Sequence, residues 1–287
     1  ARQVYDPKGK GALIDFKVEG FEAAFAQTQA LMQANQPVFE AGFRAEGALA
    51  FADVMLPIKR GGKRAWRMVE VKSSTSVKGY HRDDAAVQAF LARSSGVPLA
   101  EIALAHIDSS WVYPGGGDYS GLLVENDLTD EAFSRGTEVR SWIEESHGIV
   151  AKKEPRVSTG EQCSAPYECG FFSYCQSQEP QAEQPLHWLP GAQSKGLKAH
   201  VEAHGVCELR DVPDALLNEK QRRVKAVTLT GKTYFDKDSA LRELAQHKLP
   251  AFFMDFETIQ FAVPIWKGTR PYQQIPFQFS VHRLART

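Results

Sequence analysis

Three charged residues in the first half of the chain have the types and spacing of a metal site. Glu70 and Lys72 lie two positions apart, so in a strand their side chains point to one face while Val71 points into the core. A hairpin over 54–69 would bring the carboxylate of Asp53 beside Glu70. Two carboxylates and the backbone carbonyl of Val71 make an oxygen site that suits Mg²⁺ or Mn²⁺.

Such a site is typical of enzymes that cleave phosphodiesters. Mg²⁺ keeps several waters and binds through one or two carboxylates plus a substrate phosphate, and it activates water for attack. The Lys72 ammonium would hold the attacking water, help to deprotonate it, or neutralise charge in the transition state. The alternative is an ordinary solvated strand face on which Glu70 and Lys72 form an ion pair.

A second group of candidate ligands is formed by Cys163, Cys169 and Cys175, which are evenly spaced in a turn-rich segment. The chain has 4 cysteines, too few for a disulfide scaffold at this length. In a cytoplasmic chain the cluster favours metal ligation. Three thiolates are one ligand short of a Cys₄ zinc or iron–sulfur site, and Cys207 is a candidate for the fourth. Three unliganded thiols are the alternative.

The elements that must position these residues follow from hydrophobic periodicity and turn signals. Gly61-Gly62, between basic residues, predicts the turn of a hairpin. We expect strands over 11–19, 37–44, 47–58, 65–73 and 101–113, and helices over 20–35, 82–95 and 130–146. This order of elements predicts an α/β domain with a mixed sheet.

The rest of the chain has a different character. The cysteine segment ends a first domain at 1–176, and a Gln- and Pro-rich linker follows at 177–194. A helical connector is predicted over 195–248, with helices at 195–204, 214–225 and 238–247. A further, partial domain over 249–287 begins with a strand at 250–256.

Composition narrows the classes of function. The 287 residues include 34 basic and 35 acidic ones, so affinity for nucleic acid must come from local patches such as 59–64 with Arg67. No apolar run reaches the roughly 18 residues of a membrane span, and no signal peptide is evident. A cytoplasmic location away from membranes is expected. Residue 1 is Ala rather than Met, and the sequence ends within a predicted strand, so we expect a fragment of a longer protein.

The motifs together resemble a known family of nucleases. The run 51–54, a hairpin, the run 69–75 and a helix with Gln88 are similar to the PD-(D/E)xK nuclease superfamily. The branch they resemble is that of the RecB-like and CRISPR-associated iron–sulfur exonucleases, over roughly residues 10–176. The resemblance implies a restriction-endonuclease-like mixed sheet flanked by helices.

The same resemblance implies roles for individual residues. It implies that Asp53 and Glu70 bind the metal, that Lys72 is catalytic, and that Gln88 organises the site or contacts the DNA strand. Glu40, on the preceding strand, is expected to be an auxiliary acid. The alternative is that Glu40 is an ordinary surface residue of that strand. The family often has a Tyr four residues after the Gln, where this chain has Ala92, so that role is not carried over.

The cysteine segment resembles the C-terminal cluster segment of the iron–sulfur RecB-like nucleases. That likeness implies a [4Fe–4S] cluster on Cys163, Cys169 and Cys175, with zinc as the alternative. In those nucleases the fourth cysteine lies far upstream of the catalytic core. No cysteine precedes Cys163 here, so the fourth ligand is expected outside this chain.

The last segment carries a weaker motif. Asp255 and Glu257 lie on one face of a hydrophobic strand, which resembles the first motif of DEDD-type, RNase H-like 3′–5′ exonucleases. The further acids that such enzymes need lie downstream of the motif, so we expect a partial domain without activity of its own. The whole arrangement resembles an uncharacterised bacterial family.

These observations predict a metal-dependent nuclease that hydrolyses DNA rather than RNA, acting exonucleolytically on single-stranded ends. A non-catalytic nucleic-acid-binding module is the first alternative, although the intact Asp53, Glu70 and Lys72 argue against it. A zinc-stabilised interaction domain is the second. Metal analysis distinguishes the zinc-stabilised domain from an iron–sulfur nuclease, since an iron–sulfur protein is brown.

Overall fold

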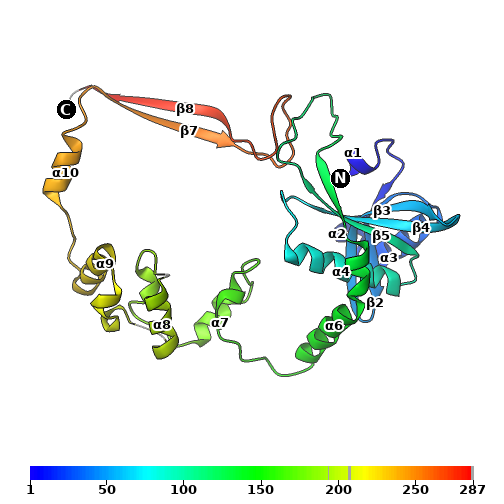
Figure 1. Cartoon of the computed structure of the whole chain (residues 1–287), viewed down its shortest axis with the longest axis horizontal. Coiled ribbons are helices and arrows are strands. Elements are labelled where there is room, and N and C mark those ends of the chain that lie inside the picture. The colour runs from blue at the N-terminus through cyan, green and yellow to red at the C-terminus, as the bar shows by residue number, and fades with distance from the viewer. Residues whose placement is uncertain (193, 206–207, 286–287) are drawn as a thin grey trace. The chain divides into compact units, whose positions relative to one another are not determined.

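A six-stranded mixed sheet organises the first half of the chain in a computed structural model, which describes residues 1–192, 194–205 and 208–285 (Figure 1). The strands lie in sequence order: β1 (Ala12–Leu13), β2 (Val38–Ala45), β3 (Ala48–Arg60), β4 (Lys63–Lys72), β5 (Leu99–Ile107) and β6 (Leu123–Asp127). β1 pairs with β2 and β4 with β5 in parallel, and the other neighbours are antiparallel. The prediction of an α/β fold with a mixed sheet is confirmed.

The chain divides by its internal contacts into two units. The first holds Ala1–Pro155 and Met254–Ser280, and the second holds Arg156–Phe253 and the described residues from Val281 onward. The helices of the first unit are α1 (Arg2–Tyr5), α2 (Phe16–Glu19), α3 (Phe21–Gln33), α4 (Gly79–Ser94), α5 (Thr129–Ser134) and α6 (Gly136–Val150). Because α4 connects the parallel strands β4 and β5, it crosses over one face of the sheet.

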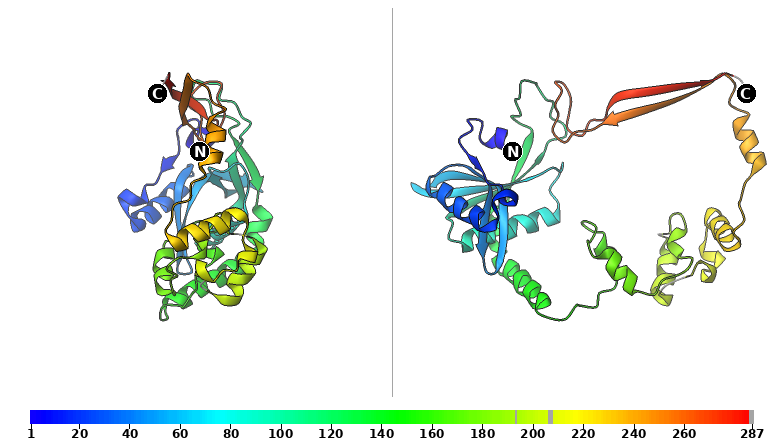
Figure 2. Two further views of the ribbon diagram at one scale, coloured as in Figure 1. Left: turned by 90° about the vertical axis from the view of Figure 1, so that its left-hand side faces the viewer. Right: turned by 180° about the vertical axis from the view of Figure 1, so that it is seen from behind.

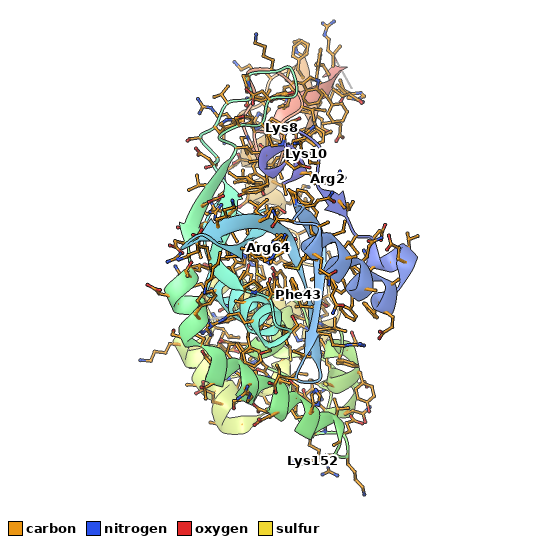
Figure 3. All side chains as sticks on the ribbon, turned by 90° about the vertical axis from the view of Figure 1, so that its right-hand side faces the viewer. Arg2, Lys8, Lys10, Phe43, Arg64 and Lys152 are labelled. Carbon is orange, nitrogen blue, oxygen red and sulfur yellow. The ribbon has the colours of Figure 1, made fainter. Side chains whose placement is uncertain are left out.

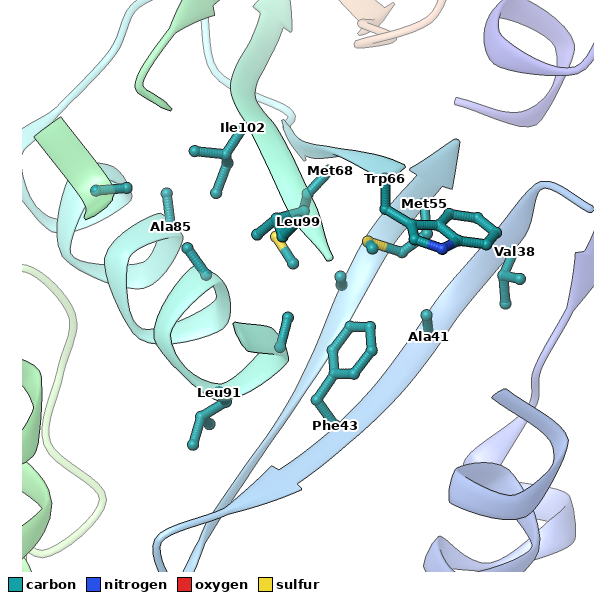
Figure 4. Packing of buried hydrophobic residues seen from close by; sticks show 14 of the residues in the cluster. Val38, Ala41, Phe43, Met55, Trp66, Met68, Ala85, Leu91, Leu99 and Ile102 are labelled. Atoms are coloured by element: carbon teal, nitrogen blue, oxygen red, sulfur yellow. The ribbon is translucent and has the colours of Figure 1, made fainter. Parts of the chain in front are cut away.

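Helix α4 can lie close to the sheet because its buried face is built largely from alanine. Ala85, Ala89 and Ala92 recur at helical spacing and are fully buried. They meet a core that includes Met55, Met68 and Trp66, as Figure 4 shows. The opposite face of the sheet carries a smaller cluster, which consists of Phe39, Val54, Val69 and Ala105.

The hairpin between β3 and β4 sets the register of the strands that carry the candidate site. Gly61 and Gly62 have φ of 57° and 80°. A type I′ turn in a two-residue loop requires positive φ at both central residues, a conformation that glycine adopts without strain. The register that follows places Met55 opposite Met68 and Val54 opposite Val69. The hairpin predicted from these glycines is confirmed.

A buried hydroxyl ties α3 to β2. Thr28 donates to the carbonyl of Ala24 at 2.8 Å and accepts from the amide of Gly42 at 2.9 Å. We expect Thr28→Val to destabilise the fold by about 1–3 kcal/mol, because it leaves the buried amide of Gly42 without an acceptor. Urea unfolding measures the change, and Thr28→Ser, which keeps the hydroxyl, is the control. Equal stability of the Val variant and the wild type would contradict this role.

In the first unit, three elements differ most from the sequence-based expectation. The strand predicted over 11–19 is short, because the Asp15 side chain accepts from the amide of Lys17 and starts α2. The helix predicted over 130–146 is two helices, α5 and α6, which meet at Arg135. Strand β6 was not predicted, because its polar sequence lacks apolar alternation; it pairs with β5 at the edge of the sheet.

The second unit is helical, with α7 (Phe172–Gln178), α8 (Lys195–His204), α9 (Glu219–Thr230) and α10 (Lys237–Leu244) (Figure 2). Its buried cluster consists of Leu189, Leu197, Leu209, Val212 and Leu217. The segment predicted as a linker, 177–194, therefore contributes Leu189 to this core. The helix predicted over 214–225 begins later, since Asn218 caps α9 by accepting from the amide of Gln221.

The remaining strands, β7 (Ala251–Ile259) and β8 (Ile275–Leu284), form a two-stranded sheet of their own. Much of this hairpin is apolar and exposed, including Phe252, Phe253, Phe277 and Phe279. Within the ranges that the structure describes, none of the helices is both long enough and apolar enough to cross a membrane.

Candidate active site at the fork of strands β3 and β4

The candidate site lies where two paired strands separate. β3 pairs with β4 only as far as Val54 and Val69, and from there back to Ala48 it pairs with β2 alone. β4 meanwhile continues beside β5 as far as Lys72. Asp53 is the first residue of β3 beyond the shared ladder. The fork leaves main-chain groups of β4 without a partner strand, and side chains can occupy that space.

Asp53 takes over one of these vacated positions. The amide of Val71 donates to Oδ2 of Asp53 at 2.7 Å, so a carboxylate replaces the main-chain acceptor of a continued ladder. Burial raises the pKa of Asp53, and this hydrogen bond and the charge of Lys72 oppose the shift only in part. The predicted proximity of Asp53 to the Glu70–Lys72 pair is therefore present. The role of the Val71 carbonyl as a metal ligand stays a prediction.

Glu70 is buried on the face of the sheet that α4 covers. Its side chain is 5% exposed, and its Oε1 accepts from Nζ of Lys72 at 2.7 Å. Its other oxygen, Oε2, is buried and has no hydrogen-bond partner among the described residues. Burial, together with the nearby charge of Asp53, raises the pKa of Glu70 to about 8. Such a carboxylate is poorly neutralised by the protein alone.

Lys72 stays positively charged between two carboxylates. Its Nζ donates to Oε1 of Glu70 and to Oδ2 of Asp84, which lies on α4. Burial alone lowers the pKa of Lys72, but the charge of Glu70 and the bonds to both acids outweigh it and raise that pKa above its usual value. In this pair Glu70 is buried, Lys72 is half-buried and the lysine is tied to a helix, unlike an ion pair on a solvated strand face.

Helix α4 brings Gln88 into the site through Asp84. The two residues are one turn apart, and Nε2 of Gln88 donates to Oδ1 of Asp84 at 3.2 Å. Gln88 is buried, and its Oε1 has no hydrogen-bond partner in the described part of the chain. The contact of Asp84 with Lys72 was not predicted from the sequence. The available signal was the spacing of four between Asp84 and Gln88.

Glu40 reaches the same region from β2. Its backbone has φ of 58°, a left-handed conformation that is rare for a residue with a side chain. The strand changes sides at this point, since Phe39 packs in one core cluster and Ala41 in the other. Burial and the charge of Asp53 raise the pKa of Glu40. A strained residue beside a buried acid is typical of functional sites.

These carboxylates have the chemistry of a hard-cation site, but Glu70 and Asp84 bond to Lys72 and Asp53 bonds to the amide of Val71. In the residues that the structure describes, no group of three or more Asp, Glu, His or Cys side chains is arranged to hold a metal ion. Two features nevertheless fit a divalent cation. Glu70 has an unsatisfied buried oxygen, and the pKa values of Asp53 and Glu70 are both raised, a cost that a bound cation would relieve.

The cysteines lie on different elements, Cys163 at the end of a 3-10 helix (Glu161–Cys163) and Cys175 within α7. The amide of Cys169 donates to the carbonyl of Cys163 at 2.7 Å, and that of Cys175 donates to the carbonyl of Phe171 at 2.9 Å. All three thiols are free, with Cys163 buried and Cys169 exposed. They do not form a metal-binding group within the described ranges, and Cys207 lies outside those ranges. A cluster on this segment stays a prediction.

Asp255 and Glu257 lie exposed on β7, on the same face of the strand as predicted. The hydrogen bond that Asp255 makes is local, with the amide of Phe256 at 2.9 Å. The resemblance of Asp255 and Glu257 to a DEDD-type motif stays a prediction.

The basic tip of the β3–β4 hairpin is partly neutralised by the sheet itself. Arg60 pairs with Glu101 at 3.3 Å, and Arg67 pairs with Glu101 at 3.6 Å and also with Glu125. Arg64, labelled in Figure 3, donates to the carbonyl of Gln33 at 2.9 Å. Several of these cations therefore have internal partners, which reduces the charge that the tip offers to a phosphate backbone.

Comparison with known proteins adds little about this site. Residues 252–287 match the model of a family described as a domain of unknown function, DUF2779. No curated protein matches the chain. A crystal structure described as that of SSO0001 aligns with a TM-score of 0.28 and 16% identity, over 57% of this chain and 71% of that one. So weak a likeness carries no argument about fold or activity.

Proposed function

We propose that the chain is a metal-dependent nuclease that hydrolyses phosphodiester bonds in DNA, exonucleolytically and at single-stranded ends. The observation that carries the proposal is the buried Glu70, which lies beside Asp53 at a strand fork and is bridged by Lys72 to Asp84. A buried acid with an unsatisfied oxygen and a raised pKa lowers the stability of a fold. Such acids are frequent at sites that bind a ligand or carry out a reaction.

In this proposal the residues at the fork divide the work. Asp53 and Glu70 hold Mg²⁺ or Mn²⁺, with the carbonyl of Val71 and the carboxylate of Glu40 as further oxygen ligands. The bound ion supplies Lewis-acid stabilisation of the phosphate and a more acidic water. Lys72 is a fixed ammonium that can orient the attacking water or stabilise the negative charge that develops on the phosphate oxygens.

Helix α4 supplies the positioning groups. Asp84 holds the ammonium of Lys72, and Gln88 holds Asp84, so the helix determines where the positive charge lies. The unsatisfied Oε1 of Gln88 can accept from a substrate group or a water. The choice of DNA and of single-stranded ends rests on the resemblance to RecB-like nucleases alone.

Two further assignments belong to the same proposal. The segment with Cys163, Cys169 and Cys175 binds a [4Fe–4S] cluster, with a fourth ligand that is not one of these three thiols. The β7 acids Asp255 and Glu257 belong to an RNase H-like exonuclease segment. A brown colour with broad absorption near ~400 nm would identify the cluster, whereas zinc without iron would favour the structural alternative.

Incubation of end-labelled single- and double-stranded DNA with Mg²⁺ or Mn²⁺ tests the proposal. We expect the wild-type chain to shorten single-stranded DNA from an end, and chelation of the metal to stop the reaction. Iron content is measured first, so that loss of the cluster is not mistaken for a missing active site. Folded wild-type chain with its cluster intact that leaves both substrates uncut in both metals would refute the nuclease assignment.

Asp84 offers a test that sequence motifs alone would not suggest. We expect Asp84→Asn to lower kcat by roughly tenfold to a hundredfold, because Lys72 loses one of its two charged partners. Steady-state cleavage of labelled DNA measures the change. Asp83→Asn is the matched control, since the neighbouring Asp83 pairs instead with Arg135 at 2.7 Å. Equal losses in the two variants would argue against a specific role for Asp84.

A further inference from the structure

A loop near the C-terminal end of the chain contacts the segment that follows Lys72. This loop, residues 260–274, connects β7 to β8 within the stretch that matches DUF2779. The hydroxyl of Tyr272 donates to the carbonyl of Ser73, a contact between residues 199 positions apart. Ser73 directly follows Lys72, and the chain then leads through 74–78 into α4.

The loop is fixed at several points besides this contact. Thr269 and Gly268 exchange main-chain hydrogen bonds with Tyr113, at 3.0 and 2.8 Å. The hydroxyl of Tyr119 donates to the carbonyl of Pro264 at 3.3 Å, and the rings of Tyr113 and Tyr119 stack with centroids 4.9 Å apart. The loop therefore rests on the connection between β5 and β6, a rigid support for the Tyr272 side chain.

Tyr272 itself is held in a strained conformation. Its φ is 58°, which is rare for a bulky residue and costs roughly 1–3 kcal/mol. Its amide donates to the carbonyl of Phe261 at 2.7 Å, and its carbonyl accepts from the side chain of Gln260. Both main-chain groups are thus bonded while the hydroxyl is directed to Ser73. Strain that the surroundings maintain in this way is frequent at positions that serve a site.

We infer that Tyr272 is a positioning residue for the candidate site, through which the DUF2779-matching segment fixes the turn after Lys72. That turn connects the strand that carries Glu70 and Lys72 to the helix that carries Asp84 and Gln88. On the other side, the carbonyl of Ser74 accepts from the amide of Ile107 at 2.8 Å. With both carbonyls held, the distance between β4 and the start of α4 is fixed, and with it the Lys72–Asp84 contact.

Tyr272→Phe removes the hydroxyl alone and tests the inference. Hydrogen exchange followed by mass spectrometry should show exchange over 73–78 accelerated by about fivefold. Acylation of the Lys72 amine, measured per residue, should also accelerate severalfold relative to Lys63 at the hairpin tip. Thr269→Val is the matched control, because it removes a hydroxyl bond that stays within the same loop, to the carbonyl of Trp266 at 2.6 Å, and keeps the main-chain bonds to Tyr113. It should leave exchange over 73–78 and acylation of Lys72 unchanged.

The effect on cleavage rests on the proposed function, whereas exchange and acylation do not. In an active enzyme, Tyr272→Phe should lower kcat by about fivefold with an unchanged KM, since Lys72 is displaced while substrate contacts remain. Unchanged exchange over 73–78 in Tyr272→Phe overturns the inference. Faster exchange overturns it as well if acylation of Lys72 is not faster, or if kcat of an active enzyme is unchanged. If the wild type cleaves nothing, the nuclease proposal fails and the two labelling measurements still decide the role of Tyr272.

Discussion

Lys72→Ala is expected to reduce the rate of DNA cleavage by about a thousandfold. The Lys72 ammonium contacts both Glu70 and Asp84, and it is held at 2.7 Å from Oε1 of Glu70. Removal of a fixed charge aimed at the reacting phosphate removes stabilisation that is present only in the transition state, so kcat falls while KM changes little. Single-turnover cleavage of labelled DNA in Mg²⁺ measures the rate directly.

A fold defect must be separated from a chemical one in this variant. Without Lys72 the buried Glu70 loses its positive partner, so the variant is also expected to be less stable near neutral pH. Thermal unfolding monitored in parallel shows whether the variant is folded at the assay temperature. Lys63→Ala, at the exposed hairpin tip, is the matched control for the loss of a lysine. A folded Lys72→Ala variant that retains wild-type kcat would remove Lys72 from the mechanism.

Glu70→Gln is expected to abolish metal-dependent cleavage and to stabilise the metal-free fold. The amide keeps the size of the side chain and an acceptor for Lys72, but it has no charge to bind a cation or to repel Asp53. Loss of the charge removes the cost of burying a carboxylate, so the melting temperature at neutral pH should rise. The expected loss of cleavage is again about a thousandfold.

The pH dependence of stability gives this prediction a definite sign. The pKa of Glu70 is raised from 4.5 to about 8 by burial and by Asp53. A raised pKa in the folded state means that the fold prefers the protonated acid. Its contribution to stability is therefore complete below about pH 4.5 and is lost as the pH rises through 8. The stability advantage of Glu70→Gln over the wild type should grow across that range.

Added Mg²⁺ or Mn²⁺ should make the wild type more stable than Glu70→Gln. A cation that binds the folded wild type raises its melting temperature by mass action, and the Gln variant should respond weakly. Calorimetric scans at several pH values, with and without metal, measure both effects. If Mg²⁺ and Mn²⁺ leave the wild-type melting temperature unchanged and Glu70→Gln does not stabilise the metal-free protein, Glu70 is not the metal ligand proposed here.

The local features of the candidate site could be read from the sequence because they depend on neighbouring residues. Strand periodicity places Glu70 and Lys72 on one face, and Gly61-Gly62 predicts the turn that brings β3 back along β4. Both expectations agree with the structure. Strand β6 could not be found in the same way, because an edge strand with polar residues carries no apolar alternation.

The tertiary structure decided which groups actually meet. The sequence determined an α/β fold, a β-hairpin and a pair of charged residues on one strand face. The fold added the bond from Val71 to Asp53, the contact of Lys72 with Asp84, and the link from Tyr272 to Ser73. These contacts depend on where β3 leaves β4, how close α4 lies to the sheet, and where a distant loop is supported. Periodicity within one element contains none of that information, since packing between elements sets it.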